Sequence, residues 1–211
     1  MLKKILIALV ILVAGFAGVV AMQPSEFKVE RTATIAAPPA NVFQHVDDLH
    51  KWDAWSPWAK LDPNAKATFD GEKEGQGAGF AWAGNDEVGE GRMTITDSKP
   101  HEQILIRLEF IKPFAATNTT EFTFRPVEGA ADQTQVTWTM TGHNNFISKA
   151  FCMFMNMDKM VGGDFEKGLA SMKAAAEAEA RAKSQEPPDA KGLDATEENG
   201  AGEGENSKGT K

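Results

Sequence analysis

The sequence feature that most constrains the fold is a run of strand-like segments followed by one long amphipathic helix. Between residues 66 and 144, apolar and polar residues alternate in successive short segments that are separated by turn residues. The segment ILIRLEF is typical, since one of its faces carries Ile104, Ile106, Leu108 and Phe110. Alternation with a period of two residues predicts half-buried antiparallel strands. We therefore expect about six strands in this region.

The segment from Phe146 to about Arg181 predicts the long helix. Apolar residues recur there every three or four positions and form one stripe, which contains Ile147, Phe151, Phe154, Val161, Phe165, Leu169, Met172 and Ala176. Gly162 and Gly163 interrupt the segment, but the stripe keeps its phase across them. We therefore predict a bend or a close-packing point at these glycines rather than a helix end.

Another strand and a helical pattern precede the run of strands. FKVERTATIA, from Phe27 onward, alternates like a strand, and helical spacing begins after Pro38 and Pro39. Strands in succession with helices at both ends predict the α+β class. We expect a helix-grip architecture, in which a curved antiparallel sheet of about seven strands wraps around the long C-terminal helix and two short helices follow the first strand.

The N-terminus predicts a membrane segment, residues 1–24. After Lys3 and Lys4 the chain continues with eighteen residues that carry no charge. This is longer than the apolar region of a typical signal peptide and just long enough to cross a bilayer. We favour an uncleaved single-pass anchor, with an exported soluble protein after signal cleavage as the alternative. The two lysines place the N-terminus in the cytoplasm and the following domain outside it.

Composition separates a folded domain, residues 25–181, from a C-terminal tail. Residues 182–211 are acidic and contain one leucine and no aromatic residue, which predicts a disordered tail. The whole chain has a net charge of −8 and no basic stripe, so nucleic acid is not expected as a partner.

Four segments carry a resemblance to a known superfamily. They are IAAPPANVFQHVDDLHKWDAWSPW, VGEGRMTI, LEFIKPF and MDKMVGGDFEKGLASMK. In their order they resemble the SRPBCC superfamily (START and birch-pollen-allergen-like proteins), and within it the bacterial polyketide cyclase/dehydrase-like branch. The resemblance covers residues 27 to about 176 and implies the helix-grip fold. Its members bind lipids, hormones or polyketides, and many have no known activity, so the resemblance alone does not decide the function.

Two clusters of apolar residues are candidates for the wall of a ligand cavity. HKWDAWSPWAKLDP holds three tryptophans. They form either a structural plug, which is a packed hydrophobic cluster that joins helix to sheet, or, as the resemblance implies, one end of the cavity. CMFMNMDKM suits a pocket for varied apolar ligands, ordinary core, or contact with the nearby bilayer. Our predicted wall residues are Trp55, Trp58, Trp82, Phe110, Phe114, Met153 and Met157.

Polar candidates are few. The four histidines and Cys152 show no metal-ligand spacing, and no cofactor motif is present, so neither a metal nor a cofactor is expected. Arg31 shares the inward face of the first strand, where it either grips an acidic ligand or, as we favour, forms a surface ion pair. Asn118 and the pair His143 and Asn144 are further polar candidates.

The function expected from the sequence is binding of a hydrophobic small molecule or lipid between sheet and helix, by a membrane-tethered domain outside the cytoplasm. Because the sequence contains no convincing acid/base pair, it leaves open whether the protein is an enzyme. The alternatives are a cyclase/dehydratase-like enzyme acting on a polyketide or aromatic substrate, and a protein-interaction module.

Overall fold

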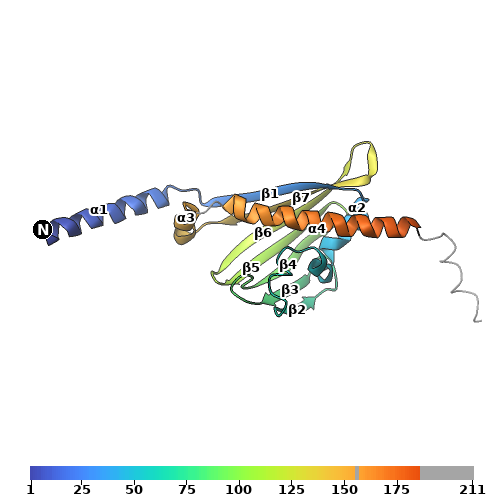
Figure 1. The fold of residues 1–211 in the computed structure, drawn as a ribbon, viewed down its shortest axis with the longest axis horizontal. Helices are drawn as coiled ribbons and strands as arrows, with labels where there is room; N and C mark the ends of the chain where they lie inside the picture. The colour runs from blue at the N-terminus through green and yellow to red at the C-terminus, as the bar shows by residue number, and fades with distance from the viewer. Residues whose placement is uncertain (155–156, 186–211) are drawn as a thin grey trace, which may run out of the picture.

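The computed structural model describes residues 1–154 and 157–185. Its elements begin with α1 (Leu2–Ala21), β1 (Glu26–Ile35), α2 (Pro39–Asp47) and the 3₁₀ helix η1 (Leu49–Ala54). The remaining strands are β2 (Lys66–Gly71), β3 (Ala78–Ala83), β4 (Glu90–Lys99), β5 (Gln103–Lys112), β6 (Ala116–Val127) and β7 (Ala130–His143). The last helices are α3 (Phe146–Cys152) and α4 (Met157–Gln185). Figure 1 shows α4 lying along the sheet and α1 extending away from it.

The strands form one curved antiparallel sheet of seven strands in the order β1-β7-β6-β5-β4-β3-β2. Strands β2 to β7 are neighbours in sequence and in space, as expected for a meander of hairpins. Strand β1 is the edge strand next to β7, and the two strands pair in the register Glu26↔His143 to Ile35↔Thr134. The predicted helix-grip fold is therefore confirmed, with α2 and η1 as the two short helices after the first strand.

The core lies between the concave face of the sheet and the second half of the predicted helical stripe. Phe165, Leu169 and Met172 are buried. The ring of Phe165 stacks on that of Trp138 of β7, with 3.9 Å between ring centroids and 8° between ring planes. Because aromatic rings bury large areas, this pair anchors α4 to the sheet.

The predicted single helix from Phe146 to Arg181 is wrong in one respect, because the structure divides it into α3 and α4. The side chain of Asn145 caps α3 by accepting a hydrogen bond from the Ser148 backbone N–H at 2.8 Å. On α3 and just after it, Ile147, Phe151 and Phe154 are exposed instead of contacting the sheet. Two helices that follow each other in phase give the same apolar stripe as one helix, which explains the error.

Gly162 is a close-packing point, as predicted. A Cβ atom at this position would overlap Nη2 and Cζ of Arg31, whereas a Cβ at Gly163 would meet nothing within 4 Å. The missing side chain at Gly162 therefore lets the Arg31 guanidinium lie against the helix backbone.

These neighbouring glycines give a matched prediction about stability. Gly163→Ala is expected to raise the free energy of unfolding by up to about 1 kcal/mol, because alanine favours the helix more than glycine does. Gly162→Ala is expected to lower it, because the new methyl group displaces the Arg31 guanidinium from its hydrogen bonds. Urea unfolding followed by circular dichroism measures both changes. Equal gains in the two variants would contradict the close packing at Gly162.

Candidate functional site

One end of the concave face carries a row of aromatic side chains that are only half-buried. Trp82 pairs with Gly91, and Gly91 pairs with Phe110, so these residues share one face of the sheet. Phe80 lies two residues before Trp82 and pairs with Met93, a member of the core, which identifies this face as the concave one. We call Phe80, Trp82 and Phe110 the aromatic row.

Ring contacts and a glycine position the aromatic row. The centroid of the Trp82 ring lies 6.0 Å from that of Phe80 and 6.1 Å from that of Phe110. The indole N–H of Trp82 donates a hydrogen bond to the Val88 carbonyl at 3.0 Å. Because Gly91 has no side chain, the indole ring can lie directly over its Cα. The row is therefore a partly exposed apolar surface held by its neighbours.

The tryptophans of the 50–63 segment divide between the core and its edge. Trp52 and Trp55 are buried, and Trp55 is only 1% exposed. Their indole N–H groups donate hydrogen bonds to the carbonyls of Val46 at 3.0 Å and His45 at 2.7 Å. These bonds and the burial favour the plug interpretation for both residues. Trp58 is half-buried at the edge of the core, 6.0 Å from Trp138 between ring centroids.

The remaining predicted wall residues lie in different surroundings. Leu108, which was not among the predicted wall residues, lies beside the aromatic row on the concave face and is also half-buried. Phe114 lies between β5 and β6 and is 76% exposed, and Met153 after α3 is exposed as well. The side chain of Met157 lies outside the described residues. The structure thus brings Trp82 and Phe110 together, whereas Phe114 and Met153 are not buried with them. A role in ligand binding stays a prediction for all seven.

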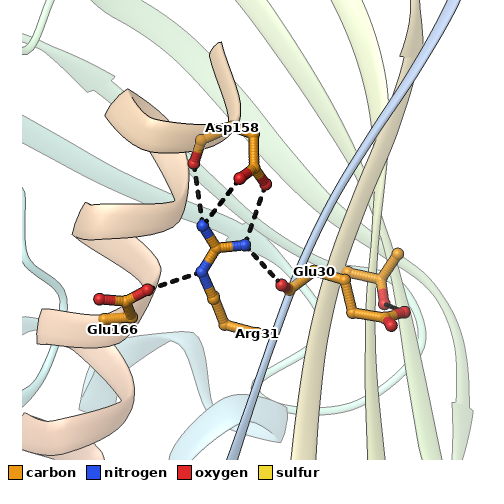
Figure 2. A network of polar contacts seen from close by, with 5 residues as sticks. Glu30, Arg31, Asp158 and Glu166 are labelled. Carbon is orange, nitrogen blue, oxygen red and sulfur yellow. Dashed lines mark hydrogen bonds and ion pairs between the residues drawn. The ribbon is translucent and has the colours of Figure 1, made fainter. Parts of the chain in front are cut away.

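Arg31 forms the ion pair that the sequence favoured. Its Nε donates to Glu166 Oε1 at 2.7 Å, and its Nη1 and Nη2 donate to the two carboxylate oxygens of Asp158 at 2.9 and 3.1 Å. Nη1 and Nη2 also donate to the backbone carbonyls of Glu30 and Asp158. Figure 2 shows the guanidinium between β1 and the first turns of α4.

These bonds occupy all five N–H donors of the Arg31 guanidinium. The hydrogen bonds that Arg31 donates to Asp158 and to Glu166 raise the pKa of Arg31, and the Arg31 guanidinium in turn lowers the pKa of Asp158. The guanidinium therefore ties β1 to α4, and it would have to break existing bonds to grip an acidic ligand.

Three polar groups are buried on or near the concave face. Asn118 and Thr120 project from β6 on the face of Met93 and Ile106, and Nδ2 of Asn118 lies 3.8 Å from the sulfur of Met140. In the part of the chain that the structure describes, the indole N–H of Trp138 is buried without a hydrogen-bond partner. The sequence singled out Asn118 but missed the other two. Their inward position follows from strand alternation, but whether each group finds a polar partner depends on the tertiary contacts.

A buried histidine lies beside the plug rather than beside the aromatic row. His45 Nε2 is 3.2 Å from Glu179 Oε2 of α4. Burial lowers the pKa of His45, and the Glu179 carboxylate partly opposes this effect. Within residues 1–154 and 157–185, His, Cys, Asp and Glu side chains do not gather in any group of three or more that could hold a metal ion.

The structure also has an open hollow of about 490 Å³ at the edge of the sheet where β1 begins and β7 ends. It is lined by Glu26, Phe27, Lys28, Thr117, Thr119, Thr141, Gly142 and His143. Of the polar candidates, only His143 lines it, and none of the seven predicted wall residues does.

The fold and this concave face define a helix-grip protein. The family model described as polyketide cyclase / dehydrase and lipid transport matches residues 26–177. The chain therefore belongs to this family, and the resemblance to the SRPBCC superfamily is confirmed. A comparison with curated proteins finds no match.

Solved structures agree on the fold. A protein from Nitrosospira multiformis is 20% identical, with a TM-score of 0.51, over 74% of this chain and 99% of its own. A protein of unknown function from Staphylococcus aureus is 14% identical, with a TM-score of 0.55, over 74% of this chain and 96% of its own. A hypothetical protein from Helicobacter pylori is 10% identical, with a TM-score of 0.55, over 71% and 88%. At these identities the likeness supports the fold and not a shared activity.

Proposed function

We propose that the protein binds a hydrophobic small molecule or lipid at the aromatic row of the concave face. The observation that carries this proposal is the row itself, because Phe80, Trp82 and Phe110 are large apolar side chains that the fold leaves half-buried. Apolar surfaces of this kind, with a few polar groups nearby, are typical of small-molecule sites. The family description, which includes lipid transport, supports the same class of ligand.

The position of α4 supports an opening at this end of the sheet. Helix α4 packs mainly on β1 and also contacts α2, on one side of the concave face, whereas η1 contacts both α4 and β3. The aromatic row lies on β3 and β5, on the other side. A ligand that covers the row would bury apolar surface, which contributes roughly 25 cal/mol per Å² before ordering costs.

The buried polar groups suggest how a ligand would be oriented. Asn118 and Thr120 project from β6, next to β5 in the sheet. Asn118 pairs across the strands with Leu108, which lies beside the row. An amide and a hydroxyl can both accept and donate hydrogen bonds, so they suit a ligand that carries a carbonyl or hydroxyl group.

We further propose that α1 tethers this domain to a membrane, with the domain outside the cytoplasm. Helix α1 has 20 residues and a mean hydropathy of 2.6, which is long and apolar enough to cross a bilayer. A signal sequence would meet the same criteria. Lys3 and Lys4 at its start support a cytoplasmic N-terminus.

Native mass spectrometry of the full-length protein, released from lipid nanodiscs, tests the binding proposal. We expect a bound apolar compound, or uptake of a fluorescent fatty acid when the protein is supplied with one. Phe110→Ala is expected to weaken probe binding about tenfold or more, the effect of losing one aromatic contact. Ile111→Ala, one residue along, serves as the matched control, because Ile111 is exposed and is not part of the aromatic row, and it is expected to bind normally.

Two results would count against this site, and a third would change the function proposed for it. A wild-type protein that carries no compound and takes up no probe would refute the proposal. Equal binding by the Phe110 and Ile111 variants would place the ligand elsewhere. Chemical conversion of the bound compound would instead support the cyclase/dehydratase alternative.

A further inference from the structure

One end of the molecule gathers exposed apolar side chains that the proposed ligand site does not use. Ile147 is 73% exposed and Phe154 is 78% exposed, unusual values for large apolar side chains that lie so close together in sequence. We call the following residues the apolar end: Phe114, Phe146, Ile147, Phe151, Met153 and Phe154.

The apolar end lies directly against α1. The ring of Phe154 stacks on that of Phe16 with 6.4 Å between centroids and 26° between planes, and α3 and α1 are in contact. Figure 1 shows α3 between α1 and the end of the sheet. The exposed surface of α3 is therefore continuous with a helix of membrane-spanning length.

The position of Phe16 gives the depth at which α3 would lie. Phe16 comes five residues before Ala21, where α1 ends. At a rise of 1.5 Å per residue it lies roughly 8 Å inside that end of the helix. Interfacial helices bury their apolar faces about 5–10 Å into a bilayer. If α1 spans the membrane, its contact with Phe154 therefore brings α3 to the depth of an interfacial helix.

The hairpin between β5 and β6 reaches the same end of the sheet. Strand β6 begins where β7 ends, as the pair Asn118↔Gly142 shows, and β7 leads into α3 after His143. Phe114 lies in the connection that joins these two strands, which carry Phe110 and Asn118. It is thus a second exposed apolar group at this end of the molecule, in addition to those of α3.

We propose that the apolar end docks on the phospholipid bilayer in which α1 is anchored, so that α3 and Phe114 enter its interfacial layer. The inference rests on the proposed anchor and goes beyond it. Docking would hold the domain against the membrane and restrict its motion about residues 22–25, which connect α1 to β1. Docking places the α3 end of the sheet at the bilayer surface, where an apolar ligand can pass between lipid and protein with little exposure to water.

Site-directed spin labelling of the full chain, reconstituted in phosphatidylcholine and phosphatidylglycerol vesicles, tests the docking. With Cys152→Ser as the background, labels are placed by Ile147→Cys and Phe114→Cys. Leu9→Cys in α1 is the membrane control. Ser184→Cys, near the other end of α4, is the aqueous control. Collisions of each label with dissolved oxygen and with a polar nickel complex report its depth, and circular dichroism checks that each variant is folded.

We expect the oxygen-to-nickel collision ratio at 147 and 114 to be several-fold higher than at 184 and closer to that at 9. Ratios at 147 and 114 that equal the ratio at 184, with a membrane-like ratio at 9, would overturn the docking while the anchor stands. A water-like ratio at 9 would refute the anchor and the docking with it. Labels at 147 and 114 that are shielded from both reagents would overturn the docking in favour of a protein partner.

Discussion

Replacing Trp55 with alanine is expected to lower the free energy of unfolding by about 3–5 kcal/mol, the range for deleting a large buried aromatic side chain. Trp55 is almost fully buried, and its ring contacts those of Trp52, Phe122 and Trp138. The substitution also removes the donor to the His45 carbonyl. Chemical denaturation of the wild type and the variant under the same conditions measures the loss.

Two companion variants separate the causes of this loss. Trp55→Phe keeps most of the ring but leaves the His45 carbonyl without its donor, so we expect a loss of about 1–3 kcal/mol. Trp58→Ala is expected to cost clearly less than Trp55→Ala, because Trp58 is half-buried. If Trp55→Ala unfolds like the wild type but binds the apolar probe poorly, Trp55 is a ligand wall and the plug interpretation is wrong.

Placing arginines in the middle of α1 is expected to move the protein from the membrane fraction to the soluble fraction or to prevent its export. Val10 and Val13 lie near the centre of the apolar helix and are exposed in the structure. An arginine at the centre of a membrane span costs about 2.5–3.5 kcal/mol on the insertion scale. The double variant Val10→Arg and Val13→Arg therefore opposes insertion strongly.

Extraction of membranes with alkaline carbonate measures this effect. The wild type and the control Val10→Leu and Val13→Leu are expected to stay in the pellet, and the arginine variant is expected to leave it. Mass spectrometry of the wild-type protein tests the anchor itself. A mature protein that lacks the N-terminal segment and is soluble would show that α1 is a cleaved signal sequence.

The candidate site could be predicted only in part. Trp82 and Phe110 are inward-facing positions of alternating strands, and the structure places both on the concave face. The sequence pattern could not separate Trp55 from Trp58, because burial depends on which elements pack over each ring. It also could not show that all five N–H groups of Arg31 donate hydrogen bonds within the protein, because Asp158 and Glu166 lie more than 120 positions away in the chain.

By itself, the sequence determined the order of the elements, the antiparallel sheet and the apolar stripe of α4, because these follow from local periodicity and from the short connections between successive strands. Tertiary structure alone decided that α3 leaves the stripe. Residues 146–154 have the period of a grip helix, but Phe154 packs on Phe16 of α1 and not on the sheet. Periodicity specifies that a helix has an apolar face, whereas only the positions of distant segments determine what that face contacts.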